Sequence, residues 1–248
     1  MANWSDPRPT AAPYATGVGA REGAYDAGLR SYMLSVYNYM ASGVLLTGIV
    51  AMLFAQSGAV MAMFTPTGGI SALGWIITLA PLAVVFGMSF GQGRLSTGTV
   101  QLLYWGFAVL MGLSLSTIFL VYTGTSIAQA FFATAAGFAG LSLYGYTTKR
   151  DLSAFGSFLI VGLIGLIVAS LLNLWFQSGT MSLVIAAVGV LIFAGLTAYD
   201  TQKIKSMYAY VAGTEMQGKT AIMGALNLYL DFINMFLFVL RLFGSQRN

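Results

Sequence analysis

The sequence predicts an all-α membrane protein, a seven-transmembrane-helix bundle in which helix 7 is central and surrounded by three helical hairpins. The chain is 58% hydrophobic and only 7% charged, whereas soluble globular domains carry about 25% charged residues. Its apolar runs are continuous and long enough for transmembrane helices, which need about 20 residues. They do not show the alternating segments of about ten residues that are typical of a membrane β-barrel.

The chain divides into a tail and one membrane domain. Residues 1–31 are rich in Ala, Gly and Pro, hold three Arg and lack the apolar segment of a signal peptide. We expect a disordered cytoplasmic tail over 1–31 and a seven-helix transmembrane domain over 32–248. The expected spans are 32–55, 72–91, 99–122, 126–147, 154–176, 181–202 and 221–243.

The segments between these spans contain turn-forming residues, such as TPTGG at 65–69, GQGR at 91–94 and QSGT at 177–180. The connections after the first, third and fifth spans are short and uncharged, which predicts three hairpins. The seventh span is left unpaired. Because it also carries a buried acid, we expect it to be hidden in the middle of the bundle.

Basic residues indicate the orientation. Nine of the 11 Lys and Arg residues lie in the tail or after the second, fourth and sixth spans. By the positive-inside rule, the N-terminus of this multi-pass membrane protein is cytoplasmic. Arg241 and Arg247 fall on the other side. A re-entrant helix 7 would place them better, so that alternative stays open.

Composition excludes several chemistries. The chain has no Cys and no His, which excludes disulfides, thiolate metal sites and a Cys nucleophile, and removes the usual pH switch. The net charge of +4 is explained by residues beside helices, so no nucleic-acid partner is predicted. We expect no cofactor, and membrane lipid as the surrounding partner.

Two acids interrupt the apolar spans. Asp200 ends the sixth span, and Asp231 lies within the seventh. A carboxylate at a helix centre in lipid costs about 2.5–3.5 kcal/mol on insertion scales and usually has a function. Asn227, Asp231, Asn234 and Arg241 share one helix face. This stripe is either a polar path or sensor, or a hydrogen-bonded seam that only holds the bundle together.

Asp200 and Asp231 lie on consecutive antiparallel helices, so tilt can bring them to a similar depth. Two carboxylates in contact would share a proton and titrate as a coupled pair. Alternatively, Asp200 is a helix-end residue that faces water.

Three stretches carry a family resemblance. AYDTQKIK at 198–205 and ALNLYLDFINMFLFVLRLFG at 225–244 closely resemble the two hallmark stretches of the Bax-inhibitor family, and RSYMLSVYNYMASG at 30–43 resembles the opening of its bacterial members. The resemblance implies a calcium leak governed by a pair of aspartates. By position in the motifs these are Asp200 and Asp231. It also implies a basic latch near the cytoplasmic end of helix 2, for which Arg94 is the only candidate.

The resulting hypothesis is a pH-sensitive calcium-leak channel or transporter. Calcium is held tightly by six to eight hard oxygens. Two carboxylates, Asp200 and Asp231, with Asn227 and Asn234 offer a weak, transient calcium site, which is what conduction requires.

Three other classes of membrane protein can be compared with this sequence. An intramembrane aspartyl protease carries Gly-x-Gly-Asp, but Asp231 follows LYL, so we expect no enzyme. A retinal protein is excluded because the seventh span has no Lys for a Schiff base. A non-transporting membrane regulator of a protease or partner complex, with other membrane proteins as partners, remains the alternative.

Overall fold

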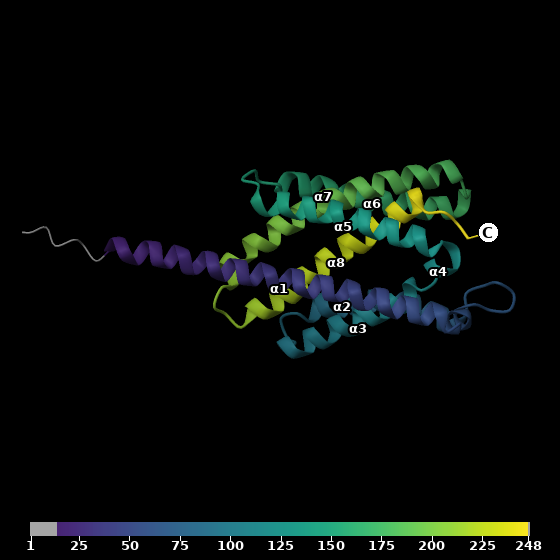
Figure 1. Ribbon diagram of the computed structural model, residues 1–248, viewed down its shortest axis with the longest axis horizontal. Coiled ribbons are helices and arrows are strands. Elements are labelled where there is room, and N and C mark those ends of the chain that lie inside the picture. Colours follow the sequence, from purple (N-terminus) through teal and green to yellow (C-terminus); the bar gives the residue numbers. More distant parts are fainter. Residues whose placement is uncertain (1–13, 248) are drawn as a thin grey trace, which may run out of the picture.

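The computed structural model describes residues 14–247 and is helical (Figure 1). In chain order the elements are α1 (Tyr14–Gln56), η1 (Ala59–Met63), α2 (Ala72–Gly91), α3 (Thr97–Leu115), α4 (Ile118–Val121), α5 (Gly124–Thr147), α6 (Ser153–Phe176), α7 (Gly179–Val211) and α8 (Met216–Phe243). Within these residues, seven helices are long and apolar enough to cross a membrane, with α4 continuing α3. The predicted seven spans are therefore confirmed.

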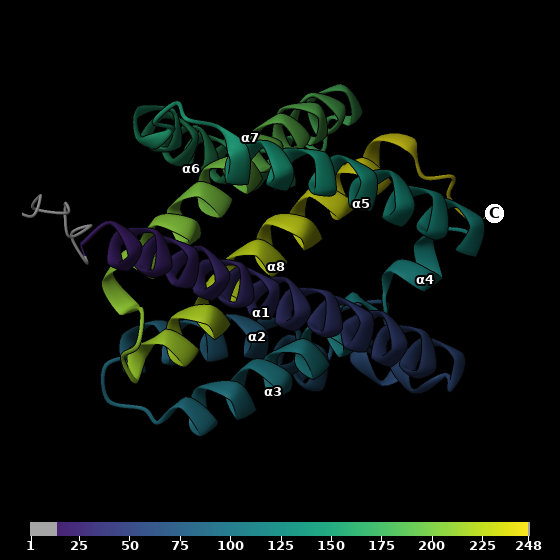
Figure 2. The same cartoon turned by 60° about the vertical axis from the view of Figure 1, so that its left-hand side comes forward.

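Helix α8 is the centre of the bundle. It runs between α1 and α3 on one side and α5 and α7 on the other (Figure 2), and it packs against all four. Ala225, Leu228 and Tyr229 are fully buried. The seventh span is central, as predicted, because its apolar side chains fill the middle of the bundle.

The packing neighbours differ in part from the predicted hairpins. Helices α6 and α7 pack as a hairpin, but α1 packs on α3 and α5 on α7. Glycines allow these close approaches. A Cβ on Gly112 of α3 would lie 2.8 Å from the Thr47 carbonyl oxygen of α1, and a Cβ on Gly145 of α5 would collide with the Ala198 carbonyl oxygen of α7. Helix η1 and the rest of the connection at 57–71 separate α1 from α2.

Residues 14–31, which belong to the expected tail, continue α1 as a helix; residues 1–13 lie outside the described part of the chain. The helical extension packs on the far end of α7. The Tyr25 and Tyr32 ring centroids lie 5.2 and 5.3 Å from that of Tyr208, and Gly28 faces the Tyr208 hydroxyl. Aromatic packing between two extended helix ends thus stabilises a segment that hydropathy does not mark.

The connection between the sixth and seventh spans is also shorter than the expected segment 203–220. Helix α7 continues to Val211 and α8 begins at Met216, so only residues 212–215 connect them.

The structure does not support the re-entrant alternative for the seventh span. Helix α8 is one helix of 28 residues, about 42 Å long at 1.5 Å per residue, and the hydrocarbon core is about 30 Å thick. Beyond α8, the Arg247 backbone N–H donates to the Val121 carbonyl oxygen at 2.8 Å, and its guanidinium donates to the Phe119 carbonyl oxygen at 3.2 Å. These bonds hold Arg247 against the end of α4.

Candidate functional site

A cavity of about 1000 Å³ lies between α6, α7 and α8. Its α6 wall is mainly apolar. The α7 and α8 walls supply all the charged side chains and two amides, which are Asp200, Lys203, Asn227, Asp231, Asn234 and Arg241. Asn173 and Gln177, at the end of α6, add two further amides. The polar stripe of the seventh span thus faces a cavity and not a tightly packed helix.

Close packing of α7 on α8 places the two acids on the wall of this cavity. Two glycines make the approach possible. A Cβ on Gly189 would lie 2.6 Å from the Phe238 ring, and one on Gly224 would lie 3.1 Å from Ile204. The two helices are antiparallel neighbours joined by a short turn. Asp200, 11 residues before the end of α7, therefore lies at a level similar to that of Asp231, 15 residues after the start of α8.

The carboxyl groups of Asp200 and Asp231 are neighbours on the cavity wall, near enough for each to act on the charge of the other. Asp231 is 5% exposed, and its Oδ2 meets no N–H or O–H donor from any other described residue. A hydrogen bond between two carboxyl groups requires one of them to carry a proton, because ionised carboxylates are acceptors only. Two ionised carboxylates held this close repel each other, and a proton on one of them removes that repulsion.

Lys203 is the cation nearest to the pair along the chain. It lies three residues after Asp200, so the two side chains share a face of α7, and both line the cavity. The Lys203 Nζ lies 5.9 Å from the centroid of the Tyr199 ring. Its charge acts on Asp200 through space. Sequence reasoning overlooked this residue, although its spacing from Asp200 was a readable signal.

Arg94 does not latch the acids in this structure, so that expectation is corrected. It is exposed in the connection between α2 and α3 and is not among the residues that line the cavity. The reason is the packing order, because α3 and not α2 packs against α8.

The two asparagines line the cavity on either side of Asp231. The Asn234 side-chain amide donates to the Leu230 carbonyl oxygen at 2.8 Å, which leaves its side-chain oxygen free to accept. Within residues 14–247 no cluster of three or more His, Cys, Asp or Glu residues can hold a metal ion. Oxygen ligands for calcium would thus come from two carboxyl groups and two amides.

A second polar contact was not foreseen. Gln202, on α7 beside the acids, accepts from the Leu152 backbone N–H at 2.9 Å and donates to the Arg150 carbonyl oxygen at 2.8 Å. It fixes the α5–α6 connection against α7 and so sets the position of α6, the outer wall of the cavity.

Comparison with known proteins decides the family. The family described as inhibitor of apoptosis-promoting Bax1 matches residues 29–248. The chain belongs to the Bax inhibitor family. Relatives in that family include inner membrane protein YbhL of Escherichia coli, 48% identical over 223 residues that cover 89% of this chain and 94% of the relative. An uncharacterized protein of Rickettsia prowazekii is 48% identical over 225 residues, covering 90% and 93%.

An uncharacterized protein of Caulobacter vibrioides is 43% identical over 229 residues, covering 90% of this chain and 92% of its own. These Bax inhibitor relatives match over nearly their full length. The resemblance read from residues 198–205 and 225–244 is confirmed.

Proposed function

We propose that this Bax inhibitor family protein is a pH-sensitive calcium-leak channel or transporter of the bacterial inner membrane, gated by Asp200 and Asp231. One observation carries the proposal: a buried carboxyl pair lines a large cavity, and its Asp231 Oδ2 has no other described donor. A seam that only held helices together would satisfy that oxygen with a neighbouring donor, because unsatisfied buried polar groups are costly.

The cavity offers a path for the ion along the bundle. Its lining on α8 extends from Asn227 to Arg241, about 21 Å of helix at 1.5 Å per residue. The oxygens of Asp200, Asp231, Asn227 and Asn234 are hard ligands, which suit calcium. Because they are few, calcium is held briefly and released, as conduction requires.

The shared proton sets the direction of gating. With one proton, the pair is joined by a hydrogen bond and α7 stays on α8. When that proton leaves, two like charges in contact repel, and α7 and α8 separate. The other titratable or charged groups in the cavity wall are Lys203, Tyr199 and Arg241; none of these is a second acid that can take over the proton. Calcium leak therefore rises with pH.

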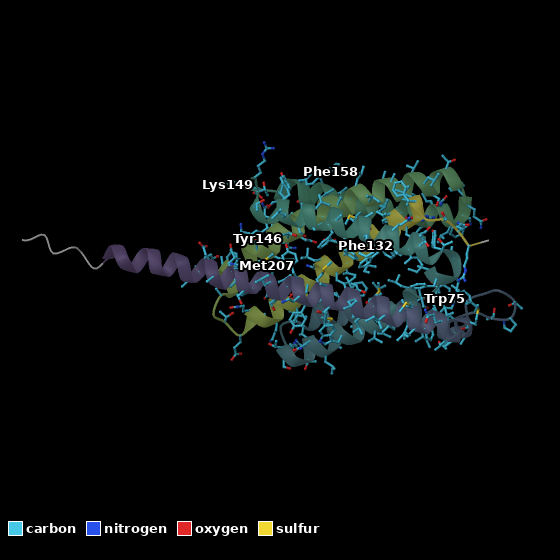
Figure 3. The ribbon with its side chains drawn as sticks, in the orientation of Figure 1. Trp75, Phe132, Tyr146, Lys149, Phe158 and Met207 are labelled. Atoms are coloured by element: carbon cyan, nitrogen blue, oxygen red, sulfur yellow. The ribbon has the colours of Figure 1, made fainter. Side chains whose placement is uncertain are left out.

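The orientation follows the positive-inside rule. Lys149, on the α5–α6 connection, lies at the end of the molecule where α1 begins, and Trp75 of α2 lies at the opposite end (Figure 3). With the Lys149 end in the cytoplasm, a single cysteine at Ser153 is labelled from inside, and cysteines at Ser57 and Thr125 from outside. Labelling of Ser153 from outside in intact cells contradicts this orientation.

Calcium flux into liposomes tests the proposed activity. Wild-type protein is expected to admit calcium faster than protein-free liposomes, and Asp200→Asn and Asp231→Asn are expected to change that rate. Asp151→Asn, an exposed acid in the α5–α6 connection, is the matched control and should leave the rate as in wild type. Flux equal to that of protein-free liposomes at every pH would remove the proposal.

The alternative, a non-transporting regulator of a protease or partner complex, has one observation in its favour. The ends of α1 and α7 pack together and extend past the apolar segments, with Tyr25, Tyr32 and Tyr208 between them. In this alternative, the two helix ends form a surface for a membrane-protein partner. If this is the function, deletion of residues 1–31, which removes Tyr25 from the Tyr208 contact, abolishes it while both Asp→Asn variants retain it.

A further inference from the structure

The cavity beside the acid pair has two unlike walls. The α6 wall is apolar and open on its outer side, since Leu171 and Leu174 line it and are 57% and 71% exposed. Helix α6 packs on α7 but not closely on α8, so this side opens toward lipid. A volume of about 1000 Å³ is that of sites for drug-sized organic molecules, which are about 300–1,000 Å³.

The polar wall offers negative charge and aromatic rings. Asp231 Oδ2 is an unpartnered acceptor on a residue that is 5% exposed. The rings of Phe193 and Phe238 line the same cavity and stack with centroids 6.0 Å apart, and Tyr199 lies beside Asp200. Aromatic faces attract organic cations within about 6 Å.

We infer that the cavity binds a hydrophobic organic cation, a quaternary ammonium or phosphonium or a protonated amine with an aryl or alkyl body. The positive charge sits at Asp200 and Asp231, and the apolar body lies along α6 after entering from the lipid side. The inference uses the acid pair of the proposed leak but does not require that the protein conduct calcium.

The other charged side chains of the cavity, Arg241 and Lys203, do not cancel the negative charge that the ligand would meet. Arg241 lies ten residues from Asp231 along α8, about 15 Å of helix, and is exposed, so it does not neutralise the pair. Lys203 is exposed and acts on Asp200, so Asp231 supplies the charge that faces the ligand. A quaternary cation has no N–H group to satisfy, and a protonated amine can donate to Asp231 Oδ2.

Equilibrium dialysis with two probes of the same shape tests the site. Radiolabelled tetraphenylphosphonium and tetraphenylborate are each dialysed against the full chain in an uncharged detergent. We expect the cation to bind at least about tenfold more tightly than the anion, in line with the effect of a single buried charge contact.

Matched variants locate the binding. The preference for the cation should be lost in Asp231→Asn and in Leu171→Trp, which fills the cavity from an exposed position. It should remain in Asp151→Asn and in Leu172→Trp. Leu172 neighbours Leu171 on α6 and is 49% exposed, but it does not line the cavity.

Equal binding of the two probes overturns the inference. A preference for the cation that survives in Asp231→Asn or in Leu171→Trp also overturns it. So does a preference that is lost equally in the two control variants. Because dialysis measures no ion flux, its result is independent of the calcium experiment. If the liposomes show no calcium flux but the protein still prefers the organic cation, only the proposed function is contradicted.

Discussion

The hydroxyl groups of Thr47 and Tyr229 lie 2.7 Å apart in the middle of the bundle. The Thr47 hydroxyl donates to the Ala108 carbonyl oxygen at 2.8 Å, so the Tyr229 hydroxyl donates to Thr47. The Phe107 ring packs edge-on against Tyr229, with centroids 5.0 Å apart. One relay of hydrogen bonds therefore joins α1, α3 and the central α8.

The two ends of this relay should differ in their effect on the free energy of unfolding. Tyr229→Phe leaves Thr47 bonded to Ala108, so we expect a loss of about 0.6 kcal/mol, typical of hydrogen bonds between membrane helices. Thr47→Val leaves the buried Tyr229 hydroxyl without a partner, which costs about 1–3 kcal/mol. Unfolding of both variants in mixed micelles measures the order, and an equal or reversed order contradicts the assigned donor direction.

Gly145 permits the close contact of α5 with α7. A Cβ there meets the Ala198 backbone carbonyl, and backbone atoms do not move aside as a flexible side chain does. We expect Gly145→Ala to lower the free energy of unfolding by about 1–3 kcal/mol, as overpacking does. Gly140→Ala on the same helix is the control, since a Cβ there meets nothing within 4 Å. If both substitutions have the same effect, helix propensity and not packing governs this site.

Asp151 gives a pH dependence outside the membrane. Hydrogen bonds from the side chain and the backbone N–H of Ser153 lower the pKa of the Asp151 carboxyl. Because the folded state favours the ionised form, its stabilisation is present above the ordinary Asp pKa of about 4 and is lost as pH falls through the lowered pKa. Asp151→Asn should therefore be less stable than wild type at neutral pH only.

Thermal unfolding of wild type and Asp151→Asn across the acid range measures this difference. It should shrink as pH falls below about 4. A difference that stays constant, or grows, in acid would show that the carboxylate makes no favourable contact in the folded state.

The seven spans could be predicted because lipid requires about 20 consecutive apolar residues for each helix. The predicted span 72–91 has the same bounds as α2. The differences fall where α1 and α7 continue beyond their apolar segments. Residues 14–31 belong to α1 and residues 203–211 to α7. Tyr25 and Tyr32 pack on Tyr208 there, a long-range contact that hydropathy does not reveal.

The site was predicted only in part. Helix periodicity placed Asn227, Asp231 and Asn234 on one face, and the scarcity of charge in the apolar spans singled out Asp200 and Asp231. Neither indicates which helices are neighbours. Arg94 was chosen by its place in the chain, but α3 lies between α2 and the acid-bearing pair in the packing order. The apolar α6 wall was not foreseen, because its residues read only as a lipid-facing span.

The most direct test of the account is the pH profile of calcium leak in liposomes that contain wild type or the double variant Asp200→Asn/Asp231→Asn. The chain has no His, the residue that ordinarily responds between about pH 6 and 8. The account predicts that wild-type leak rises across this window and that the leak of the double variant does not change with pH. A double variant that keeps the wild-type pH profile would contradict the assignment of the sensor to these two aspartates.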